Sequence, residues 1–281
     1  MTVRLTIFCV GILFLIACDK LFDRGEIITS DYEPELNVYG LVSFDEIMGN
    51  PINPTSSSFV RVHRTLALNE NPQGDTAFHV YDADVTITAS SGYSTKFLEP
   101  YESETGTYID LFDEFVPDFE TDYTLEINAQ NGMSVTGILH TPPRPIFKLL
   151  PEVINPDSFF TITWEPYVNA MARVQVKGWG AGCNIEKNKY FENGETEWTT
   201  KIFSCYNDEE GYYSDNPENL SIQLTFMDTN YYDYFINYSG DGFFNFLMGI
   251  YGNTQEAYGV IGGLGVFGSY ATETAMISFD P

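Results

Sequence analysis

Short segments in which apolar and polar residues alternate recur along the chain from about residue 35 onward. Such alternation puts the apolar side chains on one face of a strand, so each segment predicts a half-buried β-strand. The clearest segments are 36–42, 59–64, 83–89, 123–127, 133–139, 159–164, 172–179, 220–226 and 274–279. Turn-forming residues separate them, and Asn131-Gly132 between two of them is a strong hairpin signal. The pattern predicts an all-β chain.

A proline-rich stretch, 141–145, separates these segments into two groups. We therefore expect an N-terminal β-sandwich over 35–143 and a C-terminal β-rich domain over 144–281. The strand that ends at Trp164, with its polar turn and next strand, resembles the opening of a fibronectin-type sandwich. The predicted fold class is thus all-β, with two immunoglobulin- or fibronectin-like β-sandwiches. Asp228 predicts the cap of a short helix over 231–236.

The first residues form a separate, strongly apolar segment. Arg4 precedes an uncharged run over 5–17, which is too short for a spanning helix of about 20 residues and fits a signal peptide over 1–17. The run ends in Leu15, Ile16, Ala17 and Cys18, which resemble the lipobox of bacterial lipoproteins. This resemblance implies lipid attachment, including palmitate-type acylation, at Cys18. Residues 18–34 then form the lipidated cysteine and its tether.

The charge of the chain is strongly negative, with 40 Asp and Glu against 13 Lys and Arg. Such a surface repels phosphate backbones and anionic headgroups, so we expect no nucleic-acid partner and membrane contact only through the lipid anchor. Solubility, a cationic partner, divalent metals and a salty habitat each remain open as reasons for the charge.

The chain has four cysteines, of which Cys9 leaves with the signal peptide and Cys18 takes the lipid. Cys183 and Cys205 remain as a candidate disulfide in an oxidising compartment. Two unconnected buried thiols are the alternative. The spacing does not match a zinc site.

Several of the predicted strands follow a pattern found in one family. The matching segments are 36–40, 81–87, 106–108, 123–125, 132–143 and 262–270. Together they resemble the uncharacterised lipoproteins catalogued as domain of unknown function 4249. Members are predicted outer-membrane lipoproteins, often encoded beside TonB-dependent receptors. The resemblance implies an outer-membrane location and such a receptor as partner. It implies no catalytic residue.

A literal G-x-G-x-x-G motif covers residues 263–268. A dinucleotide site needs a helix after the motif, whereas the residues after Gly268 predict a strand. We therefore expect no nucleotide and no other cofactor, and interpret the motif as a glycine turn or bulge that leads into the last strand.

Acidic residues are densest between 110 and 122, where Asp110, Asp113, Glu114 and Asp118 are weak candidates for calcium. A solvated acidic face is the stronger interpretation, so no metal site is assigned. His63, His79 and His140 share no ligand spacing, and His63 alternates with buried valines, which predicts a solvent-facing ring. No catalytic residue is assigned.

These features predict an outer-membrane-anchored lipoprotein that is a non-catalytic accessory and binds a ligand or a TonB-dependent receptor barrel. Whether it faces the periplasm or the cell surface stays open. One alternative is an exported hydrolase of polymers, with a carboxylate pair hidden among the many acids. The other is a structural or adhesive surface module.

Overall fold

The computed structural model describes most of the chain after the N-terminal segment. The described residues are 33–44, 58–66, 78–100, 105–112, 114–130, 132–155, 158–180, 183–192, 194–202, 206–207, 212–213, 219–237 and 257–279. Residues Glu35–Pro281 form one compact unit. Leu15, Ile16, Ala17 and Cys18 lie outside the described residues, so the lipobox stays a prediction. Within the part of the chain described, no helix is long and apolar enough to cross a membrane.

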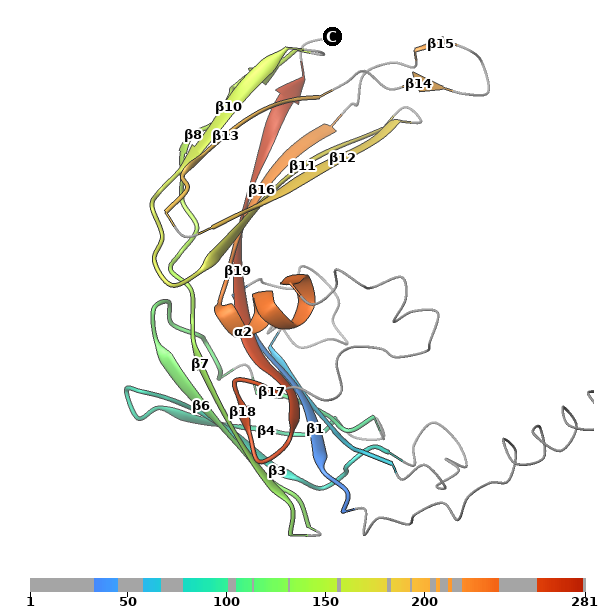
Figure 1. Ribbon diagram of the computed structural model, residues 1–281, viewed down its shortest axis with the longest axis vertical. Helices are drawn as coiled ribbons and strands as arrows, with labels where there is room; N and C mark the ends of the chain where they lie inside the picture. The colour runs from blue at the N-terminus through green and yellow to red at the C-terminus, as the bar shows by residue number, and fades with distance from the viewer. Residues whose placement is uncertain are drawn as a thin grey trace, which may run out of the picture. The chain divides into compact units, whose positions relative to one another are not determined.

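Strands dominate the described residues, which confirms the predicted all-β class (Figure 1). They are β1 (Leu36–Ser43), β2 (Phe59–Arg64), β3 (Asp84–Ala89), β4 (Ser94–Phe97), β5 (Thr107–Ile109), β6 (Asp122–Asn128), β7 (Ser134–His140), β8 (Phe147–Leu149), β9 (Val153–Ile154), β10 (Phe159–Trp164), β11 (Met171–Gly180), β12 (Cys183–Phe191), β13 (Glu197–Lys201), β14 (Tyr206–Asn207), β15 (Tyr212–Tyr213), β16 (Asn219–Met227), β17 (Ala257–Tyr258), β18 (Val260–Ile261) and β19 (Leu264–Phe279). One short helix, α2 (Thr229–Tyr232), continues into a π-helical turn, η1 (Asp233–Asn237).

One nine-stranded sheet runs through the whole unit. Its order is β12-β11-β16-β19-β1-β2-β5, and β9 and β17 also pair with β19. The 16-residue strand β19 pairs with β1 in parallel through its first half and with β16 in antiparallel through its second half. Figure 1 shows β19 in red beside β1 and then beside β16. A single strand therefore contributes to both halves of the unit.

The first sandwich packs a five-stranded sheet, β18-β7-β6-β3-β4, on the nine-stranded sheet. Alternate residues of β6 are buried, as the sequence pattern predicts. Leu125 of this strand shares one apolar core with Val38 of β1 and Phe267 of β19. Each fully buried aliphatic side chain of this kind stabilises the fold by about 1.5–3 kcal/mol. A β-sandwich is therefore present here, as the predicted fold class requires.

The second sandwich packs the three-stranded sheet β13-β10-β8 on the other end of the nine-stranded sheet. Trp164 at the end of β10 is fully buried against Val174 of β11 and Leu224 of β16 in this second core. The Trp164 indole N–H donates to the Glu195 carbonyl at 2.9 Å, so the buried polar atom has a partner. The strand that the sequence predicts to end at Trp164 is confirmed as β10.

The predicted hairpin and helix are both present. β6 and β7 pair through the turn at Gly132, which has φ of +86°. Asp228 caps α2, since its carboxylate accepts a hydrogen bond from the Tyr231 amide at 2.7 Å. The helix begins two residues earlier than the sequence predicts, because Thr229 already adopts helical geometry after this cap.

The end of the chain returns to the first sandwich. β18 pairs with β7, and residues Leu264–Tyr270 of β19 pair with β1. The division of domains at residue 143 stays a prediction, but both sheets of the first sandwich include strands from beyond it.

Candidate functional site

The sequence-predicted cysteine pair is only partly described. Cys183 begins β12, and Cys205 lies outside the described residues. The disulfide therefore stays a prediction.

The acidic residues around 110–122 have different environments. Asp110 is buried, and its carboxylate accepts hydrogen bonds from the amides of Phe112 at 3.2 Å and Phe115 at 2.5 Å. Glu114 and Asp118 are exposed, and Asp113 lies outside the described residues. Asp110 thus fixes a turn. Among the described residues no three His, Cys, Asp or Glu side chains form a group that could hold a metal. The weak calcium hypothesis for the full set stays a prediction.

Most of the glycine-rich motif lies inside the last strand, so the predicted turn is limited to its first residue, Gly263. Gly265 has φ of +103°, and β19 begins at Leu264 and continues far beyond Gly268. The helix that a dinucleotide site requires after the motif is replaced by this strand.

Two histidines that are separate in the sequence lie together in the fold. The rings of His63 and His79 stack at 4.9 Å, and the two residues form an isolated β-bridge. The Nε2 atom of His63 is buried and has no hydrogen-bond partner among the described residues, so the prediction that this ring faces solvent is wrong. The pKa of His63 falls to about 4, mainly because the ring is buried and secondly because His79 lies beside it. Sequence spacing could not reveal this pair, because an isolated bridge joins His63 of β2 to His79, which lies outside the strands.

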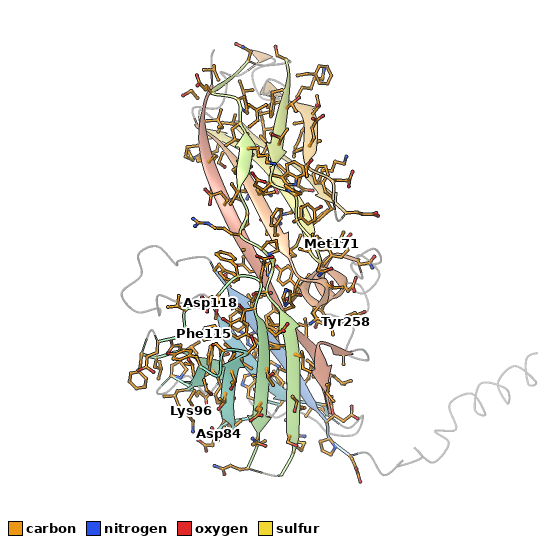
Figure 2. All side chains as sticks on the ribbon, turned by 90° about the vertical axis from the view of Figure 1, so that its left-hand side faces the viewer. Asp84, Lys96, Phe115, Asp118, Met171 and Tyr258 are labelled. Carbon is orange, nitrogen blue, oxygen red and sulfur yellow. The ribbon has the colours of Figure 1, made fainter. Side chains whose placement is uncertain are left out.

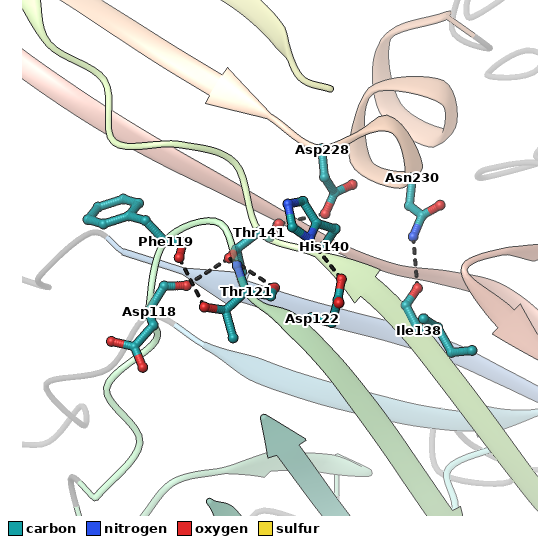
Figure 3. A network of polar contacts seen from close by, with 10 residues as sticks. Asp118, Phe119, Thr121, Asp122, Ile138, His140, Thr141, Asp228 and Asn230 are labelled. Atoms are coloured by element: carbon teal, nitrogen blue, oxygen red, sulfur yellow. Dashed lines mark hydrogen bonds and ion pairs between the residues drawn. The ribbon is translucent and has the colours of Figure 1, made fainter. Parts of the chain in front are cut away.

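A polar seam joins β7 to neighbouring segments (Figure 3). The buried Thr141 hydroxyl donates to the carbonyls of Asp118 at 2.7 Å and Thr121 at 3.1 Å. The side-chain amide of Asn230 in α2 donates to the backbone carbonyls of Ile138 and Phe267, and thus links the two sheets of the first sandwich.

Beside this seam lies a hollow of about 330 Å³, with an exposed His140–Asp122 pair on one wall and Asp228 on another. The His140 Nδ1 atom lies 2.7 Å from the Asp122 carboxylate. Asp228 is 3% exposed, and its second oxygen accepts from the Ser269 hydroxyl at 2.6 Å. Burial raises the pKa of Asp228 to about 7, although its hydrogen bonds oppose this rise. Because both Asp228 oxygens already accept internal hydrogen bonds, we assign this carboxylate to capping α2.

Aromatic side chains gather on the face of the nine-stranded sheet opposite the first core, beneath and around α2 and η1. The rings in contact are those of Tyr39, Phe59, Tyr231, Tyr234, Phe235, Tyr258 and Tyr270. All seven are half-buried. Burial is the largest cause that raises the pKa of Tyr39 to about 12. We call these residues the aromatic cluster.

Gly268 explains why the helix lies so close to this face. A Cβ atom there would come within 2.9 Å of the Tyr231 backbone nitrogen, so only glycine permits α2 to contact β19.

A second hollow, of about 230 Å³, adjoins the aromatic cluster on the same face. Tyr231 and Tyr270 line one side, while Arg173, Gln223 and Thr272 come from three neighbouring strands. We call it the arginine hollow. The pattern of the sequence does not predict this group of residues, since their meeting depends on the register of β11, β16 and β19.

Comparisons with known proteins add no identity. No family model matches the sequence, and no curated protein matches it. A segment of two fibronectin type III domains from chicken tenascin is 14% identical, with 60% of this chain and 84% of that chain covered and a TM-score of 0.20. The FN1–FN3 domains of chicken CNTN1 are 10% identical over 87% and 67% of the two chains, with a TM-score of 0.31.

A tetra-tandem repeat from the extending region of a large adhesion protein is also 10% identical, with a TM-score of 0.22. It matches 88% of this chain, which spans only 50% of that chain. At these TM-scores the likenesses support no argument about function. The assignment of an all-β double sandwich rests on the sheets and cores described above.

Proposed function

We propose that this protein is a non-catalytic accessory lipoprotein, anchored to the outer membrane through Cys18, that binds a ligand or a TonB-dependent receptor barrel. The observation that supports binding most directly is the aromatic cluster with the adjoining arginine hollow. Half-buried aromatic rings next to a few polar groups on regular strands are typical of binding sites, because strands hold side chains in fixed positions.

The anchor is supported by the sequence. Leu15, Ile16, Ala17 and Cys18 resemble a lipobox at the end of an apolar run, and several acyl chains together give stable anchoring. Metabolic labelling with an alkyne-bearing palmitate tests this. We expect label on the wild-type chain and on Cys9→Ser, and none on Cys18→Ser. Label that persists on Cys18→Ser would contradict the anchor.

The receptor partner is supported by the resemblance to domain of unknown function 4249. Affinity purification of the tagged chain from gently solubilised outer membranes, followed by mass spectrometry, tests it. We expect a TonB-dependent barrel in stoichiometric amount, and loss of that barrel when Cys18→Ser is used as bait. Recovery of the lipoprotein alone would refute the receptor partnership and favour the exported hydrolase or the adhesive module.

A further inference from the structure

Arg173 lies in the middle of a row of side chains on the outer face of the nine-stranded sheet. Its neighbours Ala172 and Val174 point into the second core, so Arg173 points to the opposite face. Across the strands it pairs with Thr225 of β16, which pairs with Thr272 of β19. The next row contains Gln175, Gln223 and Thr274. The cross-strand neighbours of Arg173 on β16 and β19 are therefore neutral.

The guanidinium of Arg173 forms no ion pair with any acidic residue that the structure describes, although the chain has 40 acidic residues. By contrast, Lys96 forms an ion pair with Asp84 at 2.8 Å (Figure 2), and Lys148 forms one with Glu165 at 3.0 Å. The Nε atom of Arg173 is also buried without a hydrogen-bond partner among the described residues. A buried donor left unpaired destabilises a fold by about 1–3 kcal/mol. A bound ligand that accepts a hydrogen bond from the Nε atom would remove this loss of stability.

The residues that line the arginine hollow indicate which chemical groups such a ligand carries. Gln223 offers an amide, and the hydroxyls of Thr225 and Thr272 lie 3.2 Å apart. Amides and hydroxyls both donate and accept hydrogen bonds, as the hydroxyls of a ligand do. A guanidinium binds a planar carboxylate through two parallel hydrogen bonds. The volume of about 230 Å³ suits a molecule of monosaccharide size.

We propose that the arginine hollow binds a small carboxylate that also carries hydroxyl groups, namely a sugar acid. Arg173 pairs with the carboxylate, while Gln223 and Thr272 contact the hydroxyls. A sugar acid is a specific ligand class for the binding role proposed above, so this inference rests on that role. Its test uses the purified chain, so its failure and the failure of the receptor partnership are observed in separate experiments.

Isothermal titration calorimetry of the detergent-solubilised full chain with sodium D-glucuronate tests the site. We expect saturable binding of glucuronate and none of glucose, which has the same ring without the carboxylate. Arg173→Gln should weaken glucuronate binding at least about tenfold, the usual effect of losing hydrogen bonds to a charged group. Arg173→Lys should also weaken it, since an ammonium cannot form the planar pair.

Lys177→Gln is the matched control, because Lys177 lies on the same strand and face but outside the hollow. It should leave the affinity unchanged. Circular dichroism checks the fold of each variant. Thr272→Val provides a second test, because it removes the hydroxyl that contacts the ligand in the proposed complex and should weaken glucuronate binding. Equal affinity for glucuronate and glucose, unchanged affinity in Arg173→Gln, or no saturation at millimolar glucuronate would each overturn the proposal. Titration with a galacturonate oligomer then distinguishes a free sugar acid from the end of a polymer.

Discussion

At the scale of single residues, Asp228 shows how one buried carboxyl connects a helix to a strand. It accepts hydrogen bonds from the Tyr231 amide and the Ser269 hydroxyl, and its own amide donates to the Ser269 carbonyl. Burial nevertheless raises its pKa from 3.8 to about 7. Because the folded state holds this proton more tightly than the unfolded state, the contribution of Asp228 to stability is greatest at low pH.

We expect this contribution to decline as the pH rises from 3.8 to about 7. The maximal slope for one group is about 1.4 kcal/mol per pH unit. Asp228→Asn keeps an acceptor for the Tyr231 amide and does not titrate. Urea unfolding of both proteins at several pH values should therefore show the wild type losing stability relative to Asp228→Asn across this range. Parallel pH profiles of the two proteins would refute the shifted pKa.

At the scale of elements, a parallel pairing between the first and the last strand depends on one glycine. Gly265 of β19 lies opposite Val38 of β1, with φ of +103°. A Cβ atom at this position would come within 2.0 Å of the Val38 carbonyl oxygen. A side chain here would thus combine backbone strain with a clash against the neighbouring strand.

Gly265→Ala should lower the free energy of unfolding by at least about 3 kcal/mol, through strain and overpacking together. Gly92→Ala is the matched control, because Gly92 has φ of +89° and a Cβ atom there would meet no other atom within 4 Å. It should cost only about 1–2 kcal/mol, from strain alone. Chemical denaturation measures both values, and equal losses would show that the β1–β19 contact is less tight than described.

At the scale of the whole molecule, β19 makes the two sandwiches depend on each other. Its first half contributes Phe267 to the first core, and its second half places Ile277 against the second. If β19 separates from β1, its hydrogen bonds to β16 are disturbed as well, because one continuous strand makes both pairings. We therefore expect the two sandwiches to unfold together, as small cooperative domains do.

Leu125→Ala tests this coupling. Leu125 is fully buried in the first core, and its truncation should cost about 2–5 kcal/mol. All three tryptophans, Trp164, Trp179 and Trp198, belong to strands of the second half. If unfolding is coupled, the tryptophan fluorescence midpoint should fall by as much as the circular dichroism midpoint. An unchanged fluorescence midpoint would mean that the sandwiches unfold separately.

The sequence predicted the features that depend on neighbouring residues. Alternation identified β6 and β7, Asn131-Gly132 identified the turn between them, and Asp228 identified the helix cap. The candidate site was not predicted. Arg173, Gln223 and Thr272 are far apart in the chain, and nothing in the alternation of one strand specifies which residue of another strand lies beside it.

The sequence by itself therefore determined the all-β class, the position of many of the longer strands and the face that each of these buries, because these follow from side-chain periodicity along one segment. Only the tertiary structure decided the pairing of β19 with both β1 and β16, the stacking of His63 on His79, and the assembly of the arginine hollow. Each of these joins distant segments, and their register is set by the packing of whole sheets.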